Sequence, residues 1–159
     1  MIDSEISLID SNILVYAYDS NENDKHIISK NILNKCWKKE VSYALSTQNL
    51  SELFVVTTKK ISNPISMKEM EENIKDIINF SNFQILKIKP KTILNAIKLS
   101  FEYKAHYWDS LIASVMQENN INTIITEDED FKKIPWLEVT NPFKEDVKSE
   151  SEKNNELVE

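Results

Sequence analysis

The chain has 159 residues, a formal net charge of −7 and a charged fraction of 28%, which suits one globular domain with a substantial core. No apolar stretch is long enough to span a membrane, and the first residues lack the basic and apolar regions of a signal peptide. A single cysteine, Cys36, excludes an internal disulfide and agrees with the cytoplasmic location that we expect. The negative charge argues against a strongly basic, nonspecific nucleic-acid binder.

Two residue types are absent, Gly and Arg, so that all 19 residues counted as Lys or Arg are Lys. Turns and helix ends that need a positive φ must therefore use another residue, and we expect Asn, which tolerates this conformation best after Gly. Asn119 and Asn120, at the expected end of a helix, are examples. A redesigned or simplified chain would also show such absences, and it would keep its fold without selection for activity.

Apolar patterns in the first half of the chain predict short strands that alternate with amphipathic helices. Ser46-Thr47 is expected to cap one helix, and Ser66-Met67-Lys68-Glu69 matches the capping-box pattern that starts another. The expected strands are residues 6–9 and 41–45, and the expected helices are residues 12–18, 24–37, 47–60 and 66–78.

The second half continues the alternation, which predicts an α/β fold with a three-layer α/β/α architecture around a mostly parallel sheet. Residues 1–143 would form this domain. Residues 144–159 hold six acids and three lysines without apolar periodicity, and we expect a disordered tail. The expected strands are residues 84–88, 122–126 and 137–139, and the expected helices begin at Pro90 and span residues 107–118.

Four acidic residues lie inside or directly beside apolar runs, where a lone carboxylate is costly to place. Asp10 ends the first strand and Asp128 follows the strand at residues 122–126, so both belong at the carboxyl edge of the sheet, where ligands bind. Asp109 shares a helical face with apolar residues, and Glu52 shares one with Val55 and Val56, so both are expected to point inward.

Four converging carboxylates repel one another, and a divalent cation with a preference for oxygen ligands would remove that conflict. Such an ion also polarises a phosphoryl oxygen and lowers the pKa of a bound water, which favours phosphodiester chemistry. For each acid alone, a helix cap or a solvated charge is the simpler interpretation. His106 and Trp108 precede Asp109; we expect a surface histidine and a packed tryptophan, with substrate contact and base stacking as the alternatives.

The motifs around these acids carry a family resemblance. The chain resembles the PIN-domain ribonucleases, and specifically the VapC-type toxins of bacterial and archaeal toxin–antitoxin pairs. The matching pieces fall in family order and span residues 6–143. They are residues 8–16 (LIDSNILVY), Ser46-Thr47-Gln48 leading to Glu52, residues 108–112 (WDSLI), Thr126-Glu127-Asp128 and residues 140–143 (TNPF).

This resemblance implies that Asp10, Glu52, Asp109 and Asp128 form an acidic site for Mg²⁺ or Mn²⁺. Asp10 and Asp109 would be the surest direct ligands, while Glu52 and Asp128 would bind through water or orient the attacking water. The member of the run 127–130 that joins the site is open, and its position favours Asp128. Ser11, Thr126 and Glu127 would be supporting neighbours.

The implied reaction is in-line attack of metal-activated water on an RNA phosphodiester, leaving a 5′-phosphate and a 3′-hydroxyl. The family also implies a homodimer, a cognate antitoxin protein and a tRNA, rRNA or mRNA substrate. Without Arg, only lysines can contact the RNA backbone; the pairs at 38–39, 59–60 and 132–133 are candidates, although solvated helix ends are the simpler interpretation.

Two other functions stay open from the sequence. An aspartate-nucleophile phosphatase would also use Asp10, but its usual second Asp is replaced here by Asn12. An inert PIN-like scaffold or interaction module would bind metal without turnover, and the absence of Gly and Arg motivates this alternative.

Overall fold

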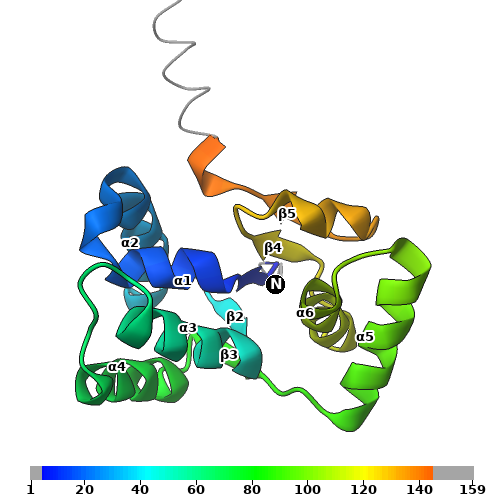
Figure 1. The fold of residues 1–159 in the computed structure, drawn as a ribbon, viewed down its shortest axis with the longest axis horizontal. Helices are drawn as coiled ribbons and strands as arrows, with labels where there is room; N and C mark the ends of the chain where they lie inside the picture. The colour runs from blue at the N-terminus through cyan, green and yellow to red at the C-terminus, as the bar shows by residue number, and fades with distance from the viewer. Residues whose placement is uncertain (1–4, 145–159) are drawn as a thin grey trace, which may run out of the picture.

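The computed structural model describes residues 5–144, and Figure 1 shows a central sheet between two groups of helices. The predicted acidic tail therefore lies outside the described residues, apart from Lys144. Within the described part of the chain, no helix has both the length and the hydropathy needed to cross a membrane. The helices are α1 (Ser11–Tyr18), α2 (Asn23–Trp37), α3 (Thr47–Lys59), α4 (Met67–Asn79), α5 (Pro90–Tyr103) and α6 (Tyr107–Glu118).

Five short strands form one sheet in the order β3-β2-β1-β4-β5, and every pairing is parallel. The expected α/β fold is therefore confirmed, with a fully parallel sheet. Parallel strands need crossover connections, which the helices supply. β1 occupies the centre of the sheet, and the connection from β3 to β4 crosses from one edge to the other side of β1. The strands are β1 (Ser7–Ile9), β2 (Tyr43–Ser46), β3 (Phe83–Leu86), β4 (Thr123–Ile125) and β5 (Glu138–Thr140).

The two faces of the sheet support separate apolar cores. Successive strand residues alternate between them: Leu8 and Ile124 pack with α5 and α6, while Ile9 and Ile125 pack with α1 to α4. Figure 1 shows α1 to α4 on one side of the sheet and α5 with α6 on the other. The three-layer architecture is thus built from the period-2 pattern of very short strands. Cys36 is fully buried in the α1-to-α4 core, as a core residue should be.

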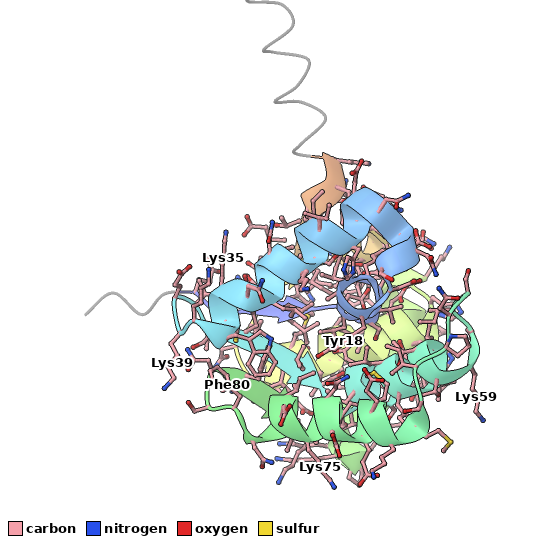
Figure 2. All side chains as sticks on the ribbon, turned by 90° about the vertical axis from the view of Figure 1, so that its left-hand side faces the viewer. Tyr18, Lys35, Lys39, Lys59, Lys75 and Phe80 are labelled. Atoms are coloured by element: carbon pink, nitrogen blue, oxygen red, sulfur yellow. The ribbon has the colours of Figure 1, made fainter. Side chains whose placement is uncertain are left out.

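Lysines surround the α1-to-α4 layer. Figure 2 shows Lys35, Lys39, Lys59 and Lys75 at the periphery and Tyr18 in the middle of this view. The interpretation of the three lysine pairs as solvated helix ends agrees with the structure, because all six residues are exposed.

Four of the described residues adopt a positive φ, and the expectation that Asn would supply these positions is only half right. Asn23 and Asn120 do so, but Lys39 (φ 61°) and Lys104 (φ 52°) fill the other two. Lys104 directly follows α5, and Lys39 comes two residues after the end of α2, positions where the αL conformation closes the last turn of a helix. A Cβ in this region costs about 1–2 kcal/mol, so the chain retains backbone strain that Gly would relieve.

Two local expectations need correction. Ser66 caps α4 by accepting a hydrogen bond from the backbone of Glu69, but the reciprocal half of the capping box is absent from the described contacts. On α3, Val55 is exposed and Leu53 is fully buried, so the inward face is offset by about one residue from the expected one. Glu52 lies at the margin of that face and is partly buried.

Candidate functional site

A pocket of about 460 Å³ opens at the carboxyl edge of the sheet, between α1, α3 and α6. Strand ends and helix starts supply its walls, as expected for an open parallel sheet. Five carboxylates line it, while no lysine of the described chain does. The lining residues are Asp10, Ser11, Asn12, Gln48, Glu52, His106, Trp108, Asp109, Ile112, Asp128, Asp130 and Phe131.

Asp10 is held at the junction of β1 and α1 by hydrogen bonds to both carboxylate oxygens. Its extended backbone makes it the N-cap of α1, where Oδ1 accepts from the Ser11 amide at 2.8 Å. The Thr126 hydroxyl donates to Oδ2 at 2.7 Å. Burial nevertheless raises the pKa of Asp10 from 3.8 to about 6, against these two hydrogen bonds and with the help of Glu52 and Asp109.

Asp109 lies in the first turn of α6, with its helix packed through Ile112, Ala113 and Met116 as the pattern predicted. Burial, helped by the neighbouring charge of Asp128, raises the pKa of Asp109 from 3.8 to about 6. Carboxylates as close as these resist simultaneous ionisation. The site therefore contains negative charge that the described residues do not neutralise.

Thr126 joins three parts of the site. Its buried hydroxyl donates to Asp10 and accepts from the Asp128 amide at 3.0 Å and from Asn12 Nδ2 at 3.2 Å. A hydroxyl with one donor and two acceptor positions is fully used by this arrangement. Thr126 thus fixes the end of β4 relative to the start of α1.

The acidic run 127–130 divides between two directions. Asp128 and Asp130 point into the pocket, where their carboxylate oxygens lie within 4.8 Å of one another and of Asp109. Glu127 turns away to pair with Lys25 at 2.9 Å and with the Tyr16 hydroxyl, and Glu129 pairs with two lysines. Asp128 has an extended backbone, and its side chain caps the 3₁₀ turn at Glu129–Lys133 by accepting from the amide of Asp130.

Glu52 approaches the pocket from α3, where Gln48 Nε2 donates to its Oε1 at 2.7 Å. The start of α3 is anchored by a buried chain of hydrogen bonds. Asn49 Oδ1 accepts from the amide and hydroxyl of Ser46, and Asn49 Nδ2 donates to Ser11 Oγ at 2.9 Å. These hydrogen bonds link the start of α3 to Ser11 of α1, the residue after Asp10.

These side chains fit a hard divalent cation. The donor set consists of carboxylate oxygens, which Mg²⁺ and Mn²⁺ prefer. Two further oxygens that line the pocket, Asn12 Oδ1 and Gln48 Oε1, are buried and have no hydrogen-bond partner in the described chain. Buried acceptors without partners are uncommon and indicate a missing ion or water. Asp109, Asp128 and Asp130 would hold such an ion, with Asp10 and Glu52 on the opposing walls.

The four predicted acids therefore line one pocket, although the tightest group contains Asp109 and Asp128 rather than Asp10. Ser11 and Thr126 support the site through hydrogen bonds, while Glu127 faces away from it.

Sequence reasoning did not single out Asp130. Asp130 lies in the 3₁₀ turn at Glu129–Lys133 and not in extended chain, so an alternating pattern does not identify it.

His106 and Trp108 lie at the rim of the pocket. His106 is exposed at the N-terminal end of α6, as expected. Trp108 is 56% exposed and contacts Tyr107 edge-to-face, so the expectation of a packed tryptophan is wrong. An exposed indole beside an acidic pocket is a surface on which a nucleobase could stack.

The chain belongs to the PIN domain family, whose model matches residues 7–137. Similar solved structures agree on the fold. VapBC2 from Rickettsia felis, bound to a promoter DNA fragment, is 26% identical, with a TM-score of 0.59 over 86% of this chain and 98% of that one. A toxin–antitoxin complex from Klebsiella pneumoniae is 23% identical, with a TM-score of 0.58 over 86% and 97%.

VapC20 of Mycobacterium tuberculosis, described as a toxin that cleaves the sarcin-ricin loop, has a TM-score of 0.63 at 13% identity over 83% of this chain and 97% of that one. A comparison with proteins of curated function found no match.

Proposed function

We propose that this protein is a Mg²⁺- or Mn²⁺-dependent endoribonuclease and the toxin of a type II toxin–antitoxin pair. One observation carries the proposal: five carboxylates of a PIN domain line a single pocket that no lysine of the described chain lines. A structural role alone would favour ion pairing of these acids, as Glu127 and Glu129 show in the same loop. Of the five pocket acids, Asp130 alone has a lysine partner among the described residues, Lys133 at 4.0 Å.

The acidic residues of the pocket would supply its negative charge and position the ion and the water. Asp109, Asp128 and Asp130 would bind the ion, and Asp10, fixed by Thr126, would complete its coordination or receive a proton from water. Glu52 would orient that water from the α3 side. A bound divalent ion lowers the pKa of a water ligand and stabilises charge on a phosphoryl oxygen.

A second groove of about 430 Å³ continues from the pocket between α1 and α3, and it shares Ser11, Asn12 and Glu52 with it. Its walls combine apolar side chains with the acids Asp19, Glu22 and Glu52, and Lys60 is the one basic residue of the described chain that lines it. We propose that this groove guides the RNA strand, with Lys60 contacting a phosphate as a point charge.

The expected partners follow from the proposed class. The Klebsiella pneumoniae and Rickettsia felis structures are complexes of toxins with antitoxins, and we propose a cognate antitoxin for this protein also. We further propose that it acts as a homodimer in the cytoplasm, on tRNA, rRNA or mRNA.

The test is incubation of purified protein with a total tRNA and rRNA pool in Mn²⁺, with and without a chelator. Asp109→Asn is the inactivating variant, and Glu129→Gln is the matched control because Glu129 lies in the acidic loop but pairs with lysines. We expect discrete fragments with 5′-phosphate ends from wild type and the control only. Equal cleavage by folded Asp109→Asn would contradict the proposal. Metal binding without cleavage of any RNA would favour the inert scaffold.

A further inference from the structure

A groove of about 230 Å³ follows the outer side of β3. β3 is an edge strand that pairs only with β2, so no strand of the described sheet covers this side. The segment that leads from β3 to the first turn of α5 supplies three lysines to its walls (Figure 1). We call this site the basic groove. Its charged side chains are Lys87, Lys89, Lys91 and a single acid, Glu118.

A short sequence pattern brings the three lysines together. Ile88 packs against the core on the α5–α6 side of the sheet. Alternate residues of an extended chain point to opposite sides, so Lys87 and Lys89 face outward on either side of it. Lys89 is extended (φ −110°, ψ 166°), and Pro90 then begins α5 and places Lys91 in the first helical turn. All three lysines are exposed.

The positive charge of the basic groove is not neutralised. None of its three lysines forms an ion pair among the described residues, whereas Lys25 and Lys75 do. The Thr92 hydroxyl donates to Glu118 at 2.8 Å. Three lysines and one glutamate leave a net charge of +2, and the N-terminal end of α5 adds a partial positive charge. In a chain of net charge −7, such a local excess indicates an anionic ligand.

The basic groove begins at the same edge of the sheet as the acidic pocket. Leu86, the last residue of β3, pairs with Ser46, which caps the helix that brings Glu52 to that pocket. The next strand is β1, which ends at Asp10. Neighbouring strands lie about 4.8 Å apart, so the ends of β3 and β1 are separated by roughly 10 Å. The two sites share no lining residue.

We propose that the basic groove binds the phosphate backbone of RNA outside the acidic pocket. Lysines contact phosphates as point charges and do not read bases, so this contact holds the strand and leaves sequence preference to other residues. The choice of RNA rests on the proposed function, whereas the place of the site rests on its charges. An acidic peptide that adds a strand to β3 is the competing occupant, and the four residues of β3 offer it only a short edge.

The first test measures binding of a fluorescein-labelled, unstructured single-stranded RNA to the full chain by fluorescence anisotropy. A chelator is present to prevent metal-dependent cleavage. The groove variant combines Lys87→Gln, Lys89→Gln and Lys91→Gln. We expect it to bind at least about tenfold more weakly at low salt. The slope of the logarithm of affinity against the logarithm of salt concentration should become shallower by about two, since each phosphate contact contributes about 0.7.

The matched control variant combines Lys30→Gln, Lys35→Gln and Lys68→Gln. These lysines are also exposed and outside the described ion pairs, but they line neither the basic groove nor the acidic pocket. Both variants lose the same charge, so a difference between them reports the place of the charge. The control should bind nearly as wild type does. Circular dichroism checks that both variants are folded.

Cleavage in Mn²⁺ separates this inference from the proposed function. We expect the groove variant to raise KM and to leave kcat unchanged, because the lysines lie outside the acidic pocket. RNA cleavage with the same KM in the two variants would overturn the basic groove and leave the nuclease standing. RNA binding that is lost only in the groove variant, without cleavage by wild type, would support the groove and contradict the nuclease. Tighter binding of polyglutamate than of RNA, lost in the groove variant, would overturn RNA as the ligand.

Discussion

The Thr126 hydroxyl donates a 2.7 Å hydrogen bond to Asp10 Oδ2 and thereby joins two residues separated by 116 positions in the sequence. The same oxygen accepts from the Asp128 amide. One buried side chain therefore sets the relative position of an acid from β1 and an acid from the segment after β4.

Replacing the Thr126 hydroxyl should weaken metal binding and cleavage at the site, although no carboxylate is removed. We expect Thr126→Val, which keeps the shape of the side chain, to lower Mn²⁺ affinity or cleavage about 10–100-fold, as for partners that orient metal ligands. Thr126→Ser should retain most of both. Isothermal titration with Mn²⁺ measures the first quantity. Wild-type affinity in folded Thr126→Val would contradict the role assigned to the hydroxyl.

The raised pKa of Asp10 predicts a pH-dependent stability of the metal-free protein. The folded state keeps this proton up to about pH 6, whereas the unfolded chain releases it near 3.8. The stabilisation is therefore fully present below pH 4 and is lost as the pH rises through about 6. For Asp10 alone, the change corresponds to about 3 kcal/mol.

Urea unfolding of wild type and Asp10→Asn at pH 4.5 and 7.5, without metal, measures this loss. We expect Asp10→Asn to gain stability relative to wild type by up to about 3 kcal/mol at the higher pH. Added Mn²⁺ should stabilise wild type at pH 7.5 more than the variant. Parallel pH profiles for the two proteins would show that the Asp10 carboxylate is not strained when ionised.

Lys60 should contribute to RNA binding through charge alone. We expect Lys60→Ala to weaken RNA affinity uniformly across sequences. The slope of the logarithm of affinity against the logarithm of salt concentration should become shallower by about one. Lys59→Ala is the matched control, because Lys59 is exposed beside it but does not line the groove. Both are measured by fluorescence anisotropy over a salt series, with the catalytically inactive Asp109→Asn background to prevent cleavage. Equal effects of the two substitutions would exclude the groove as the RNA path.

The αL lysines predict a stabilising substitution. Lys104→Gly should raise the free energy of unfolding by about 0.5–1 kcal/mol, since relief of the Cβ clash exceeds the entropy that Gly adds to the unfolded chain. Lys30→Gly, in the exposed middle of α2, should lower it by about 1 kcal/mol. Thermal or urea unfolding measures both. A loss of stability in Lys104→Gly would contradict the assigned strain.

The order of helices and strands was predictable because local patterns determine it. Ile9 and Leu8 alternate between the cores, Pro90 begins α5, and Ser46 caps α3, and each is visible in a few neighbouring residues. The left-handed lysines were not predictable, because the residue that takes a positive φ depends on where each helix ends, to within one residue.

The candidate site was predictable only in outline. The positions of Asp10 and Asp128 after strands place them at one edge of the sheet. Nothing local distinguishes Asp130 from Glu127, however, because the difference is made by the lysine and tyrosine that pair with Glu127 from α1 and α2. Such pairings depend on tertiary contacts across more than 100 residues.

The most direct test of a metal site is Mn²⁺ titration of the purified protein with Asp128, Glu129 and Asp130 neutralised in turn. We predict that Asp128→Asn and Asp130→Asn each lower Mn²⁺ affinity at least about tenfold, as expected when a metal ligand or its support is lost. Glu129→Gln should bind as wild type does, since its carboxylate pairs with Lys132 and Lys144. Equal affinities for all these proteins, or a loss in Glu129→Gln alone, would contradict a cation site formed by Asp109, Asp128 and Asp130.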